Sequence, residues 1–147
     1  IVAAVDLPVI AAGGIVDGKG IKAALALGAS AVQMGTAFLC CHEATTSPLH
    51  RAALLGAHGR HTALTNLFSG RPARGIVNRL MRELGPLSAL PPDFPHASGA
   101  LAPLRAAAEK VGDSGFSPLW AGQNVSGCRS LAAADLISAW VAEADLA

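Results

Sequence analysis

Two apolar runs in this sequence end in glycine, and together they point to the binding of a phosphate group. Leu7–Ala12 (LPVIAA) is followed by Gly13 and Gly14, and Ser30–Met34 (SAVQM) is followed by Gly35. Where no Cβ stands in the way, backbone amides at strand ends can converge on an anion. The alternative is that the glycines only make tight turns. Two successive glycine-ended runs favour the phosphate site, because a pair arises by chance less often than one.

The same stretch comes close to the phosphate loop of a nucleotide-triphosphate-binding protein. Residues 13–19 (GGIVDGK) fit the pattern G-x-x-x-x-G-K. Gly20 then stands where a Ser or Thr would bind magnesium, and Asp17 would place a carboxylate inside the phosphate cradle. The sequence therefore argues against a P-loop.

The elements that position these glycines form a predicted βαβ unit. Residues 7–12 and 30–34 are short apolar runs typical of strands buried on both faces. Between them, Asp17 can cap a helix with apolar residues three and four apart, and Gly28 is placed to end it. This order predicts two parallel neighbouring strands in an α/β fold.

The predicted βαβ unit also gives the phosphate a structural context. The helix that begins near Asp17 would add its positive N-terminus to the site. In (β/α)₈ barrels a phosphate is often held by the loops after the last two strands, together with a short extra helix. Two consecutive βα loops that end in glycine match that arrangement.

The rest of the chain is predicted to be mostly helix and loop. Ser47 and Pro48 supply a cap and a first-turn proline for a helix. Five prolines lie between residues 85 and 103, a density that favours a loop. The expected elements are helices over 48–57, 76–84, 103–111 and from Ser130 onward, a strand over 62–66, turns over 69–75 and 118–123, and a loop over 85–103.

Composition limits the classes of function. Hydrophobic residues make up 52% of the chain and charged residues 14%, whereas an ordinary globular domain carries about 25% charged residues. This apolar excess and the start at Ile1 predict a piece of a larger barrel. With a net charge of +1 and scattered aromatic residues, no nucleic acid is expected. No apolar run reaches the roughly 18 residues of a membrane span, and three cysteines without disulfide spacing favour a soluble, cytoplasmic protein.

Other polar residues leave their roles open. Cys40, Cys41 and His42 are zinc-ligand types, but their adjacency argues against a metal site, so the cysteines are predicted to fill the core. His58 and His61 are predicted to lie on a surface helix end. Four arginines could contact substrate or flavin, or serve structural ion pairs, namely Arg71, Arg74, Arg79 and Arg82. Trp120 and Gln123 could line a site, with packing favoured for the tryptophan.

Longer motifs carry a resemblance to a known family. They are AAGGI at 11–15, DGKGIKAALALGA at 17–29, AVQMGTAFL at 31–39, SGRPARG at 69–75 and LWAGQ at 119–123. Together they resemble the C-terminal portion of nitronate monooxygenases, formerly called 2-nitropropane dioxygenases. The resemblance implies an α/β fold, the last two βα units of a (β/α)₈ TIM barrel with a helical, Pro-rich extension. It also implies a flavoprotein with FMN at the C-terminal ends of the strands.

The resemblance further implies which residues contact FMN. The FMN phosphate would be held by Gly13, Gly14, Gln33, Met34, Gly35 and Thr36, with the Gly14 amide and the Thr36 hydroxyl as donors. The catalytic histidine of the family lies upstream of AAGGI. No histidine of this chain matches it, neither His42, His50, His58, His61 nor His96, so no catalytic residue is assigned.

The implied activity is the oxidation of alkyl nitronates with O₂. Two alternatives stay open: a flavin-dependent enoyl-acyl-carrier-protein reductase of the same fold, and a truncated fragment without activity of its own. Three segments are predicted. Residues 1–60 would hold the last βα units, 61–118 an extension near the active-site mouth, and 119–147 a turn and helix that pack back on the barrel.

Overall fold

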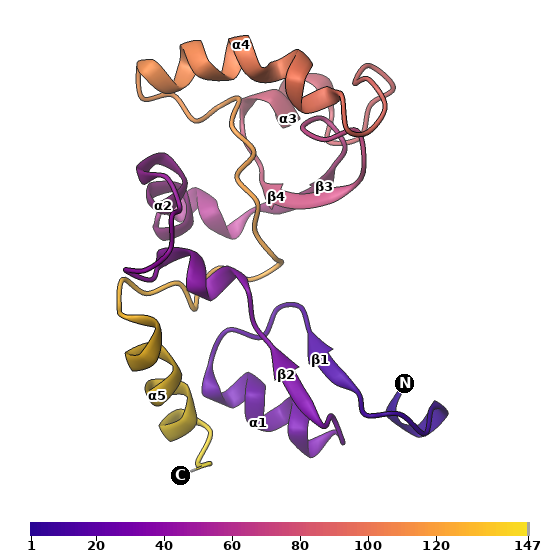
Figure 1. Cartoon of the computed structure of the whole chain (residues 1–147), viewed down its shortest axis with the longest axis vertical. Coiled ribbons are helices and arrows are strands. Elements are labelled where there is room, and N and C mark those ends of the chain that lie inside the picture. Colours follow the sequence, from indigo (N-terminus) through magenta and orange to yellow (C-terminus); the bar gives the residue numbers. More distant parts are fainter. Residues whose placement is uncertain (147) are drawn as a thin grey trace. The chain divides into compact units, whose positions relative to one another are not determined.

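The computed structural model describes residues 1–146, which form two compact units (Figure 1). Unit 1 consists of residues 1–46 and the chain from residue 124 onward, and unit 2 consists of residues 47–123. The division into segments at residues 60 and 118 stays a prediction, and its last residue, 147, lies outside the described residues.

Unit 1 contains the predicted βαβ unit. Strands β1 and β2 are parallel, with Ile10 opposite Ala31 and Ala12 opposite Gln33. The carboxylate of Asp17 caps the intervening helix, as predicted. The elements of unit 1 are η1 (Val2–Ala4), β1 (Ile10–Ala12), α1 (Gly18–Ala26), β2 (Ala31–Gln33), η2 (Thr36–Cys40) and α5 (Ala133–Glu143), where η marks a short 3₁₀ helix.

The core of unit 1 lies where α1, η2 and α5 meet. Ile21 of α1 packs with Leu136 and Trp140 of α5, and the rings of Phe38 and Trp140 meet edge to face at 5.2 Å. A Cβ at Gly18 would collide with the backbone at Trp140 and Ala144, so the packing of α1 against α5 requires glycine here. Both Cys40 and Cys41 are buried, which confirms that they fill the core.

Unit 2 is built on an antiparallel hairpin. Strands β3 and β4 pair from Thr62 opposite Ile76 to Thr65 opposite Ala73, and Gly75 forms a further bridge with Trp120. A small core of Leu67, Phe68, Leu80 and Met81 packs beside it. The elements of unit 2 are α2 (Pro48–Leu55), η3 (Ala57–Arg60), β3 (Thr62–Thr65), β4 (Ala73–Ile76), α3 (Arg79–Leu84) and α4 (Ala97–Lys110).

Two sequence-based predictions in unit 2 are wrong. Residues 73–76 form strand β4 instead of a turn and a helix start, because β3 supplies hydrogen-bond partners for their backbone. The helix then begins at Arg79, after Asn78 caps it. Helix α4 begins at Ala97, inside the predicted loop, and continues through Pro103. Pro103 donates no backbone hydrogen bond within α4, and Ala97 and Ala108 of the same helix are buried.

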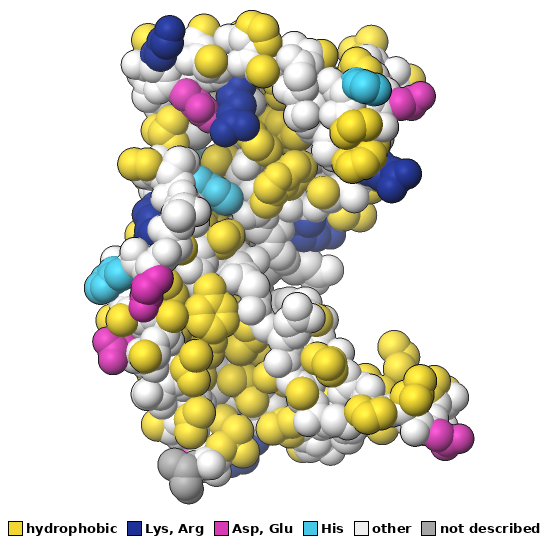
Figure 2. All heavy atoms as spheres, in the orientation of Figure 1, with side chains coloured by type: hydrophobic (Ala, Val, Ile, Leu, Met, Phe, Trp, Pro, Cys, Tyr) yellow, Lys and Arg dark blue, Asp and Glu magenta, His cyan; other side chains and the backbone are white. Residues whose placement is uncertain are grey.

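Hydrophobic side chains cover much of the visible surface, and charged ones are sparse (Figure 2). In unit 1, Ile1 is 91% exposed, Leu7 75% and Leu27 80%. Within residues 1–146, no helix combines the length and the apolar character needed to cross a membrane.

Candidate functional site

The glycines singled out in the sequence gather at one edge of unit 1. Ala12 pairs with Gln33, so the residues that follow β1 and β2 emerge together at the carboxyl ends of two parallel strands. Gly13 and Gly14 have φ angles of +94° and +75°, which residues other than glycine rarely adopt. The tight turn after β1 therefore requires glycine at both positions.

The space in front of this edge is open. A Cβ added at Gly13, Gly14 or Gly35 would meet no heavy atom within 4 Å. Gly35 has a φ of −119°, which any residue can adopt, so its backbone conformation does not require glycine. What glycine provides at position 35 is close access to the backbone. A ligand atom can therefore come as near to the main chain at Gly35 as a Cβ would, without meeting another heavy atom.

The three remaining predicted site residues differ in how they can take part. Gln33 ends β2 with an exposed side chain. Met34 is partly buried and packs its side chain against the core of unit 1, while its backbone belongs to the segment that follows β2. Thr36 is half-buried and begins η2 directly after Gly35.

A cysteine that the sequence analysis did not single out contacts the segment after β2. The Cys128 thiol donates a hydrogen bond to the Thr36 carbonyl, with a sulfur–oxygen distance of 3.4 Å. Burial, and to a smaller extent the neighbouring Cys40 thiol, raises the pKa of Cys128 to about 12. The thiol therefore stays protonated at neutral pH and keeps donating. No local pattern could reveal this contact, because the two residues are 92 positions apart.

The N-terminus of α1 differs from the sequence-based expectation. The Gly20 amide donates to Asp17 Oδ1 at 2.8 Å, and the Gly18 amide donates to Glu143 Oε2 at 3.0 Å. The bond from Gly18, followed by the bond from Arg129, lowers the pKa of Glu143. These two amides of the first turn are already used by carboxylates. The amides of Gly18 and Gly20 therefore cannot donate to a phosphate, as the sequence analysis expected of this helix end.

The histidines lie in unit 2 or on the surface. His50 Nε2 lies 3.0 Å from the Trp120 carbonyl oxygen, and burial lowers the pKa of this imidazole. His58 and His61 are exposed around η3, as predicted. Within residues 1–146, no three His, Cys, Asp or Glu side chains gather in a way that could hold a metal ion.

Three of the four arginines named in the sequence analysis make contacts within unit 2. Arg74 Nη1 donates to the backbone and side-chain oxygens of Thr62 at 3.2 Å each. The Arg71 guanidinium lies 4.8 Å from the centre of the Phe94 ring. Arg79 forms an ion pair with Glu83, one of the two roles considered for it from the sequence. Trp120 packs edge to face on Phe68, which confirms its packing role.

The sequence as a whole matches one family. The profile of the nitronate monooxygenase family aligns with residues 1–143. The chain belongs to the nitronate monooxygenase family. It is 48% identical over 139 residues to the nitronate monooxygenase of Pseudomonas aeruginosa, covering 94% of this chain and 40% of that protein. It is 44% identical over 122 residues to the probable nitronate monooxygenase of Bacillus subtilis, covering 83% of this chain and 35% of that protein.

Solved structures show the same relationship. A nitroalkane oxidase from Streptomyces ansochromogenes superposes with a TM-score of 0.86 at 45% identity, covering 98% of this chain and 41% of that one. FabK from Thermotoga maritima, as an M276A mutant, superposes with a TM-score of 0.71 at 32% identity, covering 98% of this chain and 43% of that one. The chain thus spans about two fifths of the length of these relatives, and it matches their C-terminal portion.

Proposed function

We propose that this chain supplies the FMN-phosphate site of a flavin-dependent nitronate monooxygenase, an oxidoreductase that oxidises alkyl nitronates with O₂. The observation that carries the proposal is the open, glycine-lined edge at the carboxyl ends of β1 and β2. Membership of the nitronate monooxygenase family gives that edge its context.

The proposed fold is the C-terminal part of a (β/α)₈ barrel. In this fold, β1 and β2 are the last two barrel strands, and the phosphate lies in the loops that follow them. The parallel pairing of β1 and β2 and the glycines after both strands support this assignment. Three cysteines without the spacing of a disulfide framework support a reducing cytoplasm.

The residues present fit the phosphate group of FMN. The Gly14 amide, the backbone from Gln33 to Gly35 and the Thr36 hydroxyl would donate to the phosphate oxygens. The open space at Gly13, Gly14 and Gly35 gives the group room against the main chain. When bound, FMN supplies the redox chemistry by taking electrons from the nitronate and passing them to O₂.

The contribution of this chain is to bind and orient the cofactor. Charge-assisted hydrogen bonds to a phosphate would fix its position, and the Cys128 thiol donates a hydrogen bond to the carbonyl of Thr36. No histidine of this chain is assigned as the catalytic base. That base is expected in the part of the relatives that this chain does not match.

A chimera tests the proposal. The chain is joined to the N-terminal part of the Pseudomonas aeruginosa relative that it does not match, and the product is titrated with FMN by flavin fluorescence. Stoichiometric FMN binding and O₂ consumption with propionate 3-nitronate are expected. NADH oxidation that depends on an enoyl thioester, without nitronate turnover, would instead establish the enoyl reductase and refute the monooxygenase.

A further inference from the structure

A turn upstream of α5 contacts the segments that follow both strands of unit 1. It consists of residues 125–128 (VSGC) and is closed by a hydrogen bond of 3.0 Å from the Cys128 amide to the Val125 carbonyl. Val125 is 5% exposed, and Gly127 is buried as well. The turn is therefore packed into unit 1, to which both segments also belong.

The first contact is with the segment after β1. Gly127 lies against Val16, which stands between Gly14 and the start of α1. A Cβ at position 127 would collide with the Val16 carbonyl oxygen and would lie 2.6 Å from the Val16 Cβ. The approach of the turn to this segment therefore requires glycine at position 127.

The second contact is with the segment after β2. The Cys128 thiol donates to the Thr36 carbonyl at 3.4 Å, directly after Gly35. Because burial raises the pKa of Cys128 to about 12, this donor is present throughout the neutral pH range. Neighbouring residues of one turn, Gly127 and Cys128, thus reach the two segments from the same side of the sequence.

The strands themselves do not extend to the glycines. The pairing of β1 with β2 ends at Ala12 and Gln33, so Gly13, Gly14 and Gly35 lie beyond it. A phosphate can accept hydrogen bonds from both segments at once only if their spacing suits it. Segments that already have this spacing need not be ordered when the ligand binds, and the affinity rises accordingly.

We propose that the turn 125–128 positions the two segments of the phosphate site, with Gly127 and Cys128 as its positioning residues. The inference rests on the proposed function, which places the FMN phosphate between these segments. Neither residue is assigned a contact with the flavin. Their effect is exerted through Val16 and Thr36.

A comparison of FMN with riboflavin tests the role of Cys128, because riboflavin lacks the phosphate. Both flavins are titrated into the chimera by flavin fluorescence, and the parent is expected to prefer FMN. Cys128→Ala should weaken FMN binding about threefold to tenfold and leave riboflavin binding unchanged. Cys128→Ser keeps a donor and should restore the FMN affinity. A Cys128→Ala chimera with the full preference for FMN would overturn the proposal.

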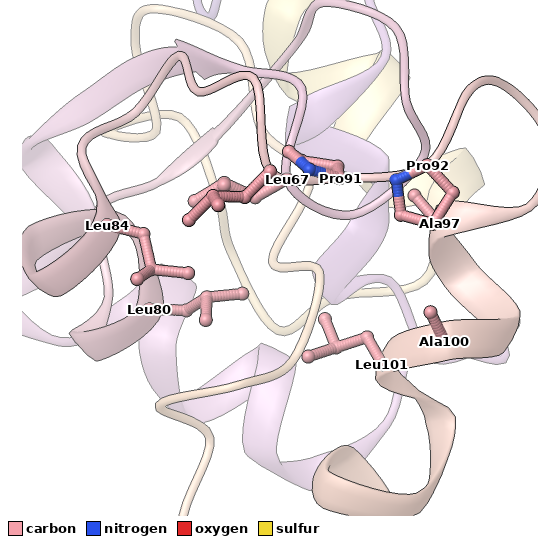
Figure 3. A pocket seen from close by; sticks show the side chains of 9 residues that line it. Leu67, Leu80, Leu84, Pro91, Pro92, Ala97, Ala100 and Leu101 are labelled. Carbon is pink, nitrogen blue, oxygen red and sulfur yellow. The ribbon is translucent and has the colours of Figure 1, made fainter.

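Two control variants separate positioning from stability. Ser126→Ala changes an exposed side chain of the same turn and should keep the preference for FMN. Leu101 faces an apolar pocket between α3 and α4 within unit 2, so Leu101→Ala should lower the Tm but also keep the preference (Figure 3). Loss of the preference in Leu101→Ala would show that it follows stability, and would overturn the positioning role.

Gly127→Ala tests the other contact. The added methyl group must displace Val16 or the turn, so FMN binding should weaken while riboflavin binding is kept. A folded Gly127→Ala chimera with the full preference would refute the role of Gly127. If circular dichroism shows that this variant does not fold, Cys128→Ala and Cys128→Ser decide the proposal.

The outcome is separable from that of the proposed function. A parent chimera that binds FMN and riboflavin equally refutes the phosphate site, and the role of the turn with it. A preference for FMN that survives in Cys128→Ala overturns the turn alone. A preference that is lost in Cys128→Ala, in a chimera that oxidises no nitronate, supports the turn and refutes the proposed activity.

Discussion

The carboxylate of Glu43 accepts the backbone N–H of Ala133 with both oxygens, at 3.0 and 3.1 Å, although the two residues are 90 positions apart. Ala133 is the first residue of α5, and the preceding Ala132 offers no side-chain acceptor. Glu43 therefore takes the place of a local cap and puts negative charge at the positive end of the helix. The sequence analysis placed the start of this helix at Ser130, and that prediction is wrong, because the helix begins at Ala133.

Removing this distant cap should destabilise unit 1. Hydrogen bonds from its own backbone amide and from Ala133 lower the pKa of Glu43, so its stabilising effect is complete above the ordinary value of 4.5 and disappears as the pH falls through the lowered value. Glu43→Ala is expected to lower the Tm at pH 7, and Glu43→Gln to lower it less, because an amide oxygen still accepts. The measurement is thermal unfolding by circular dichroism at pH 7 and pH 3. Glu83→Ala, which removes an exposed ion pair in unit 2, is the control, and an equal Tm for Glu43→Ala and Glu83→Ala would contradict the cap.

The βαβ unit could be predicted because its signals are local. A capping aspartate, a helical period and glycine-ended apolar runs lie within 35 consecutive residues, and the structure confirms the helix and the parallel pair. Strand β4 and the early start of α4 could not be predicted in the same way. Pairing with β3 and burial of Ala97 determine them, and a local pattern records neither.

The candidate site shows the same limit. The glycine positions were visible in the sequence, because open access to the backbone needs glycine. The Cys128 contact with Thr36 and the use of α1 amides by Asp17 and Glu143 depend on contacts formed only in the folded chain. The hydrogen bond from Arg74 to Thr62 likewise could not be predicted from the sequence.

The stability of unit 2 should fall in mild acid through His50. Burial, partly opposed by the hydrogen bond with Trp120, lowers the pKa of this imidazole below its ordinary value of 6.5. The unfolded chain then binds the proton more readily, so stability is complete above about pH 6.5 and is lost as the pH falls through the lowered folded value. His50→Gln should weaken this dependence, as measured by urea unfolding between pH 5 and pH 8. The same slope in His50→Gln and in the parent would show that another group is responsible.

The chain by itself should not oxidise nitronates. The expected catalytic histidine belongs to the part of the relatives that is not matched, so O₂ consumption with propionate 3-nitronate should be absent from the isolated chain and present in the chimera. Oxygen-electrode traces at equal protein concentration make the comparison. Turnover by the isolated chain would mean that one of its own histidines acts as the base.

Loss of the Thr36 hydroxyl should weaken FMN binding without abolishing it. A hydrogen bond to a charged group contributes about 1.5–3 kcal/mol, so Thr36→Val in the chimera should bind FMN about tenfold to a hundredfold more weakly. His58→Ala and His61→Ala, in exposed positions around η3, should leave the affinity unchanged. Flavin-fluorescence titration gives all three dissociation constants. A Thr36→Val protein with the parent affinity would remove the hydroxyl from the site.

Gly35→Val makes the sharpest test of the phosphate site, because the folded chain has open space around a Cβ at this position. A Cβ at position 35 meets no heavy atom within 4 Å and the φ of −119° suits any residue, so the Tm should hold. The added isopropyl group would occupy the space assigned to the phosphate, so FMN retention in the chimera should be lost. Gly99→Val, at another glycine with open space, is the control and should retain FMN. Unchanged FMN affinity in a folded Gly35→Val chimera would place the phosphate elsewhere. It would thereby remove the main structural argument that this chain binds FMN.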